Sequence, residues 1–365
     1  MSSFSFGFSG DDIEDDVQQP GPGSAQDAAA AHAIPATSAF PVDGKTLLPA
    51  TSHSLEDMLS KLPSKVAYGL LEVDLDGNGT IQLPRRELWD VRVQLMAEDE
   101  GGGAEPGLGN HDVKTGVYEG GFKSWESSMD LVKVLATPKS LLAASDEATR
   151  LIELGCGTAL PSLALFTWAF SLRTSEKDSP LSIVLADYNP TVLQLVTLPN
   201  FILAWALYQR AESPLLNDAF FTEGEFELTP QILEGFQNFL AARNISILFF
   251  SGAWSPEFVD LVNSADRSVS RAGKRQKTTI LGAETIYSPF ALNSFTQTIF
   301  SLMEHDKVNG CSSEALVGAK KLYFGVGGSL DDFITQARDR GANVEILREE
   351  AEGVRRGVVR CSLPI

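Results

Sequence analysis

The segment 151–161 has the residue types and spacing of a ligand-binding turn. Its sequence, LIELGCGTALP, places an apolar run before Gly155, Cys156 and Gly157 and a proline after them. A strand that ends in a glycine-rich turn and opens a helix lets a ligand approach the backbone and the N–H groups of the helix N-terminus. Position 160 is Leu where the dinucleotide fingerprint has its third glycine, and no P-loop lysine follows. The turn favours a cofactor without phosphates, such as S-adenosylmethionine, over a dinucleotide, with a purely structural turn as the alternative.

A second candidate ligand residue, Asp187, follows the next apolar run, 181–186. A carboxylate at the tip of such a strand can accept both hydrogen bonds of a ribose diol. Its alternative role is to cap the following helix, but Asn189 before Pro190 suits that position better. Asp187 is therefore available for the ligand, and the polar segment 173–180 is expected to be an inserted loop.

These residues lie in a region where strand-like and helix-like segments alternate. The apolar runs are 150–154, 181–186, 245–251, 278–284, 321–326, 343–349 and 354–363. The helical stretches are 124–137, 161–172, 190–210, 228–242, 289–304 and 329–340. Such alternation predicts an α/β fold with a doubly wound, Rossmann-like sheet of seven strands, whose last two strands supply an antiparallel element. Ligands of such sheets bind beyond the carboxyl ends of the strands, where the turn and Asp187 would meet.

The rest of the chain divides by composition. Residues 1–50 are rich in Ala, Gly, Pro, Ser and Asp, and we expect a disordered acidic tail because they cannot bury enough apolar surface to order themselves. Residues 51–116 are predicted to form an N-terminal extension or cap, and 117–365 the cofactor-binding domain. Alternating aromatic residues near the start are either a sticky end or a docking motif: Phe4, Phe6 and Phe8.

Residues 74–79 (DLDGNG) match the first half of a calcium-binding loop. Position 12 of that loop requires Glu, and the residue here is Arg85. A turn between two strands is the better interpretation. The four histidines and three cysteines also lack metal-ligand spacing, so no metal site is predicted.

The composition limits the classes of partner. A formal net charge of −19 disfavours free nucleic acid and favours a basic protein. The N-terminus lacks the features of a signal peptide, and no uninterrupted apolar run is long enough to predict a membrane span. Three cysteines without a pairing pattern fit a reducing compartment. We expect a monomer in the cytoplasm and nucleus.

Beyond these local signals, the chain resembles the eukaryotic histidine protein methyltransferases, a family of seven-strand methyltransferases. The resemblance runs from the N-terminal FSFGF through nearly all of the globular part. It is carried by RRELWDVRVQLM (85–96), YEGGFKSWESSMDLV (118–132), ELGCGTALPS (153–162), DYNPTVLQLVTLPN (187–200), FFSGAW (249–254), AETIY (283–287) and YFGVGGS (323–329). It implies a class I fold with S-adenosylmethionine as cofactor.

The resemblance also implies which residues bind that cofactor. The segment that closes over the methionine end is Trp125, Glu126 and Ser127. The backbone cradle is Gly155, Cys156 and Gly157, the ribose and adenine contacts are Asp187, Tyr188 and Asn189, and the adenine wall is Gly252, Ala253 and Trp254. Ala283 stands where relatives often carry Ser, so only its backbone contact can transfer.

The acceptor implied by the resemblance is one histidine of a basic protein of the large ribosomal subunit. A neutral imidazole has a lone pair at neutral pH, so the enzyme must mainly align it with the methyl group. Glu284 and Tyr287, after the fourth strand, are the candidates to orient that ring. The basic segment 266–277 is either a solvated loop, a nuclear import signal or a contact for ribosomal RNA.

Three rival interpretations stay open. A lysine methyltransferase has similar motifs but must handle an ammonium group with a pKa near 10.4. A non-catalytic chaperone of a ribosomal protein could retain the cofactor pocket. A nicotinamide-linked dehydrogenase is disfavoured by Leu160.

Overall fold

The computed structural model describes residues 41, 44, 46–98, 121–136, 147–175, 178–269, 276–323, 327–351 and 353–364. All of them belong to one compact unit, Thr37–Ile365.

The main sheet of this unit has the strand order β1-β7-β5-β4-β8-β9-β11-β10. Its five central strands are parallel: β7 (Ile245–Ser251), β5 (Leu181–Asp187), β4 (Ala148–Leu154), β8 (Gln276–Ala283) and β9 (Ser312–Lys320). β1 (Thr51–His53) is antiparallel at one edge, and the antiparallel pair β11 (Arg356–Ser362) and β10 (Asn343–Glu350) lies at the other. The chain order reverses between β4 and β8, and this is where a doubly wound sheet binds its ligand.

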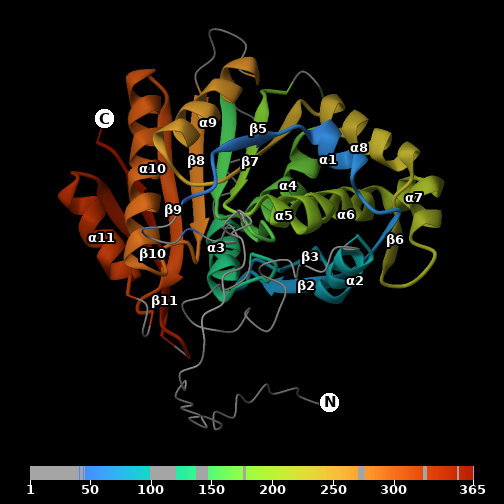
Figure 1. The fold of residues 1–365 in the computed structure, drawn as a ribbon, viewed down its shortest axis with the longest axis horizontal. Coiled ribbons are helices and arrows are strands. Elements are labelled where there is room, and N and C mark those ends of the chain that lie inside the picture. The colour runs from blue at the N-terminus through green and yellow to red at the C-terminus, as the bar shows by residue number, and fades with distance from the viewer. Residues whose placement is uncertain are drawn as a thin grey trace, which may run out of the picture. The chain divides into compact units, whose positions relative to one another are not determined.

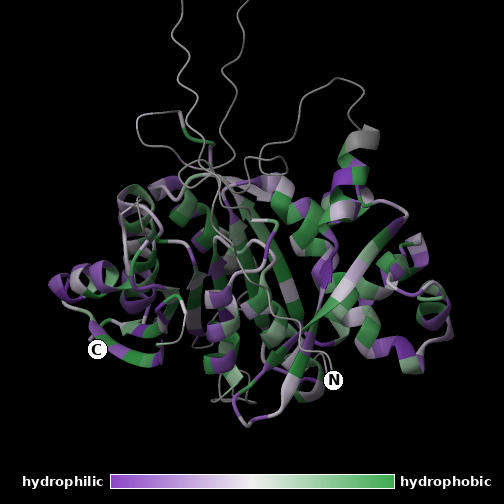
Figure 2. Ribbon diagram, turned by 90° about the horizontal axis from the view of Figure 1, so that it is seen from below, coloured by the Kyte–Doolittle hydropathy of each residue, from purple (hydrophilic) through white to green (hydrophobic). Residues whose placement is uncertain are grey.

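Helices cover both faces of the sheet (Figure 1). One core includes residues of α3 (Glu126–Ala136), α4 (Leu160–Leu172), α6 (Leu198–Gln209) and α8 (Pro230–Ala242). The other includes residues of α9 (Pro256–Val269), α10 (Pro289–Val308) and α11 (Leu330–Asp339). Along β5, Ile183 belongs to the first core and its neighbour Val184 to the second, as expected where successive side chains point to opposite faces. Hydrophobic residues accordingly follow the central strands in Figure 2.

A second, antiparallel sheet has the order β3-β2-β6, from β3 (Thr80–Arg86), β2 (Lys65–Asp74) and β6 (Glu225–Glu227). Asp74 pairs with Thr80, so DLDGNG is a hairpin turn, and the described residues contain no cluster of acidic, His or Cys side chains fit to hold a metal. The remaining helices are α1 (Leu55–Ser60), α2 (Leu88–Glu98), α5 (Pro190–Val192), the π-helix η3 (Leu193–Thr197), the 3-10 helix η4 (Arg210–Glu212) and α7 (Pro214–Ala219).

The fifth parallel strand is not where the sequence predicted it. We expected a strand over 321–326, but β9 is Ser312–Lys320, residues 321–323 follow it, and 324–326 lie outside the described residues. β9 includes Gly318 and several Ala and Ser residues, which have low strand propensity, and it is stabilised by pairing with β8 and β11 on its two sides.

Further differences concern segments that the pattern missed. β1 is an eighth strand of the main sheet, and α9 occupies a region for which no helix was predicted. The basic segment 266–277 is not one loop, because α9 extends to Val269 and β8 begins at Gln276. The residues between these two elements lie outside the described residues.

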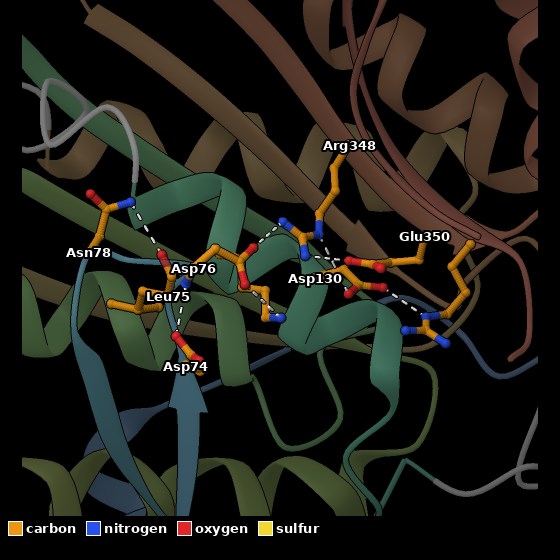
Figure 3. Close-up of polar contacts among 9 residues, drawn as sticks. Asp74, Leu75, Asp76, Asn78, Asp130, Arg348 and Glu350 are labelled. Carbon is orange, nitrogen blue, oxygen red and sulfur yellow. Dashed lines mark hydrogen bonds and ion pairs between the residues drawn. The ribbon is translucent and has the colours of Figure 1, made fainter. Parts of the chain in front are cut away.

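An ion-pair cluster joins the β2–β3 turn to the rest of the unit (Figure 3). Arg348 of β10 contacts Asp76 of the turn, Asp130 of α3 and Glu350. Arg356 of β11 donates to the same Asp130 carboxylate at 2.7 Å. Asp130 thereby fixes α3 against the sheet edge, and α3 begins beside the cavity described below.

One helical stretch, Pro190–Glu212, is long and apolar enough to cross a membrane by composition alone. Within the protein, 78% of its most apolar window is buried. Its hydrophobicity is that of a core helix, and composition is weak evidence for a span.

Candidate active site

The carboxyl ends of β4, β5, β7 and β8 meet around one cavity. Most of the residues that the sequence singled out line it: Trp125, Gly155, Cys156, Gly157, Asp187, Tyr188, Gly252, Ala253, Trp254, Ala283, Glu284 and Tyr287. Three are not among its lining residues: Glu126 is exposed, Ser127 is buried behind Glu284, and Asn189 caps α5 by accepting a hydrogen bond from the Thr191 amide.

The glycine-rich turn after β4 is held by side chains from the helix that follows β5. The Thr197 hydroxyl donates to the carbonyl of Gly157 at 2.7 Å, and the Asn200 amide donates to the carbonyl of Thr158 at 3.1 Å. Thr197 ends the π-helix η3, a type of segment often found at functional sites. The conformation of the turn is thus held by hydrogen bonds from Thr197 and Asn200, two residues outside the turn.

Asp187 joins the turns after β4 and β5. One carboxylate oxygen accepts from the Gly157 amide at 3.0 Å and the other accepts from the Asn189 amide at 3.1 Å. The Tyr188 amide also donates to this carboxylate, and because a carboxylate has about four acceptor positions, about one remains for a ribose hydroxyl. Burial raises the pKa of Asp187 to about 6.

Glu153, inside β4, is a cavity-lining residue that the sequence analysis did not single out. It is the first residue of the Glu-x-Gly-x-Gly pattern, so the signal was present. It accepts a hydrogen bond from the Ser162 amide at 3.0 Å. Burial, with a smaller effect of the neighbouring Asp187 charge, raises the pKa of Glu153 to about 7.

Two buried polar atoms at the cavity have no hydrogen-bond partner among the described residues. They are the indole Nε1 of Trp254 and the hydroxyl of Thr285, and both residues line the cavity. An unpartnered buried donor costs free energy unless a ligand or water satisfies it. Trp254 therefore offers a donor to a ring acceptor such as adenine.

The segment 46–50 forms part of the cavity wall, although it lies within the range predicted as a tail. The Leu48 amide donates to the Tyr188 hydroxyl at 3.0 Å, and the Leu48 carbonyl accepts from the Ala253 amide at 3.0 Å. Gly252 has a φ of 99° and lies so close to this segment that a Cβ there would be 2.1 Å from the carbonyl oxygen of Pro49. Leu47 of the same segment lines the cavity.

The tip of β8 adds a buried carboxylate to the cavity lining. Glu284 follows β8 with a left-handed φ of 58°, and Trp125, the residue before α3, lines the same cavity. Burial raises the pKa of Glu284, and hydrogen bonds from Ser127 and Tyr323 oppose that rise. The lining of one cavity thus combines a carboxylate suited to a ribose, Asp187, with a second carboxylate, Glu284, and the aromatic side chain of Trp125.

Comparison with known proteins decides the family. No family model matches the chain. "Histidine protein methyltransferase 1" of Schizosaccharomyces pombe is 33% identical over 315 residues, which cover 84% of each chain. The protein of the same name in Saccharomyces cerevisiae is 31% identical over 356 residues, covering 93% of this chain and 91% of the relative. The chain belongs to the histidine protein methyltransferase family.

Within this family the fold is that of a class I methyltransferase, and the cofactor is S-adenosylmethionine. Solved structures add little, since a magnesium protoporphyrin IX methyltransferase from Synechocystis with bound SAM is 8% identical with a TM-score of 0.32, over 66% of this chain and 78% of that one. The residues present fit the cofactor, because the Asp187 carboxylate keeps an acceptor position and Trp254 has a donor without a partner among the described residues.

Proposed function

We propose that this methyltransferase modifies a histidine side chain of a basic protein, and that the substrate is a protein of the large ribosomal subunit. The carrying observation is that one cavity joins the Asp187 and Trp254 cofactor groups to Glu284 and Tyr287 at the tip of β8. Membership of a family whose fungal relatives are named histidine protein methyltransferases supports a histidine acceptor. The net charge of −19 supports a basic partner.

The chemistry asks little of the protein beyond alignment. When bound, S-adenosylmethionine supplies an electrophilic methyl group on its sulfonium. Glu284 accepts a hydrogen bond from one imidazole nitrogen, which leaves the lone pair of the other nitrogen directed at the cofactor and selects the reactive tautomer. After transfer, the N–H proton leaves the methylated ring toward Glu284 or water.

The ribosomal substrate and the cellular location belong to the same proposal. A substrate assembled into ribosomes would be met in the cytoplasm and nucleus, where we expect the enzyme. The basic residues 266–277, which run from the end of α9 into the start of β8, are the candidate contact for ribosomal RNA.

The test is transfer of labelled methyl groups into ribosomal proteins from cells that lack this enzyme, with the modified residue mapped by mass. We expect label on one histidine of a large-subunit protein. Asp187→Ala should abolish it, while Asp339→Ala, a matched change at an exposed carboxylate, should not.

The same experiment separates the rival functions. Label on lysine would overturn the histidine acceptor while keeping the fold and cofactor. Absence of any label, together with tight cofactor binding, would favour a non-catalytic chaperone. Label on a histidine of a protein outside the ribosome would refute only the proposed substrate.

A further inference from the structure

The carboxylate of Glu284 is held by two hydroxyl groups that come from distant parts of the chain. Ser127 at the start of α3 donates to Oε1. Tyr323, after β9, donates to Oε2 at 2.6 Å. Both oxygens keep a further acceptor position, so the carboxylate can still receive a hydrogen bond from a molecule in the cavity.

The backbone of Glu284 is fixed as well. Its φ of 58° is a left-handed conformation that side-chain-bearing residues rarely adopt, and its amide donates to the Gly318 carbonyl at 3.0 Å. Strained conformations of this kind persist where the surroundings determine them, and they gather at functional sites. The side chain and the backbone are thus held independently.

The two hydroxyl donors are themselves held in place. A Cβ on Gly318 would lie 3.0 Å from the carbonyl oxygen of Ser127, so the absence of a side chain there allows α3 to approach β9 closely. The Lys320 amide donates to the Tyr323 hydroxyl at 3.3 Å. The Lys320 ammonium lies 5.5 Å from the ring centres of both Trp125 and Tyr323, within cation–π range.

We propose that Ser127 and Tyr323 are positioning residues, which fix the Glu284 carboxylate as the acceptor for the N–H group of the substrate imidazole. This inference rests on the proposed function. Neither residue lines the cavity among the described residues, so each acts through Glu284. For Ser127, this positioning role differs from the direct cofactor contact that the sequence resemblance implied.

Electrostatics gives the proposal a distinctive readout. Burial raises the pKa of Glu284, the hydroxyls of Ser127 and Tyr323 lower it, the Lys320 charge lowers it and the Glu126 charge raises it. An ionised Glu284 accepts from an imidazole N–H much more strongly than the neutral acid does, and it cannot instead donate a proton to the ring. Removal of one hydroxyl donor therefore raises the pKa of Glu284. As the pH is lowered, the variant should then begin to lose activity at a higher pH than the wild type.

The first experiment compares Tyr323→Phe with wild type in the full-length enzyme. We expect kcat to fall about 10- to 100-fold, the range for loss of one hydrogen bond to a charged group. The acid limb of the kcat profile should move up by about one pH unit. Tyr208→Phe, a hydroxyl deletion at a residue outside the cavity, is the control and should leave both unchanged.

A double-mutant cycle tests whether the effect passes through Glu284. If it does, Glu284→Gln/Tyr323→Phe is no slower than Glu284→Gln alone, and neither shows the shifted acid limb. Additive losses, or a wild-type acid limb in Tyr323→Phe, would overturn the proposal. Circular dichroism and cofactor titration establish that each variant is folded.

Ser127→Ala supplies a second test should Tyr323→Phe not fold, with the same expected shift of the acid limb. Gly318→Ala, which pushes Ser127 away from Glu284, should reproduce the Ser127→Ala effect. Full turnover in Glu284→Gln would refute the proposed role of Glu284 and this inference with it. Loss of turnover in Glu284→Gln with normal Tyr323→Phe and Ser127→Ala enzymes would refute the inference alone.

Discussion

The buried carboxyl group of Glu153 should make the protein less stable as the pH rises. Its side chain is only 2% exposed, and its pKa is raised from 4.5 to about 7. A native pKa above the unfolded pKa means that the native state binds more protons between the two values. The contribution to stability is therefore complete below the unfolded pKa and is lost as the pH rises through about 7.

The size of the effect follows from those two values. On account of this group, the free energy of unfolding should fall by about 2 kcal/mol between about pH 5.5 and about pH 8. In Glu153→Gln the group no longer titrates, and the amide oxygen can still accept from the Ser162 amide. The variant should therefore gain about 2 kcal/mol relative to wild type across that interval.

Urea unfolding without cofactor, followed by tryptophan fluorescence, measures this difference at several pH values. The comparison between two proteins removes the contribution of Asp187, whose pKa is also raised and which is present in both, except for the smaller coupling between the Asp187 and Glu153 charges. Asp339→Asn, at an exposed carboxylate, is the control. Parallel curves for wild type and Glu153→Gln would show that Glu153 is not the titrating group.

Two further predictions concern the segment 46–50 and the core. Tyr188→Phe removes the hydrogen bond to the Leu48 amide, so the Kd for cofactor in calorimetric titration should rise about 3- to 10-fold with kcat unchanged at saturation. An unchanged Kd would mean that this bond does not hold the cavity wall. Arg150→Met breaks a 2.9 Å ion pair with Asp306 that is almost wholly buried, and it should lower the free energy of unfolding by about 3–5 kcal/mol. In Arg150→Met/Asp306→Leu, which leaves no unpaired charge, denaturant unfolding should show a much smaller loss, and equal losses would contradict this account.

The sequence predicted the wall of the cavity that the ends of β4 and β5 form, because each signal there is local. An apolar run followed by Gly155 and Gly157 predicts a strand and a turn, and the end of the next run places Asp187 at the same sheet edge. The distinction between Asp187 as ligand residue and Asn189 as helix cap also rested on adjacent residues, and the cap is confirmed. Parallel pairing then brings the carboxyl ends of these two strands together, regardless of the length of the segment that connects them.

Strand propensity mispredicted the position of β9, because hydrogen-bonded pairing with a strand on each side outweighs the propensity of its residues. β9 contains Gly318 and small neighbours, and it is a strand because β8 and β11 supply its hydrogen bonds. The more strand-like 321–326 begins only after this strand has ended, and its Tyr323 turns to Glu284 instead. No local pattern separates these two outcomes.

The surroundings of Glu284 depended on contacts between residues far apart in the chain. The sequence determined that Glu284 follows the fourth parallel strand and that Trp125 precedes a helix. Only the tertiary structure decided that Ser127, 157 positions earlier, and Tyr323, 39 positions later, hold that carboxylate, and that 46–50 closes the opposite wall. The physical reason is that strand ends follow from short-range periodicity, whereas the approach of α3 to β9 follows from packing across the whole sheet.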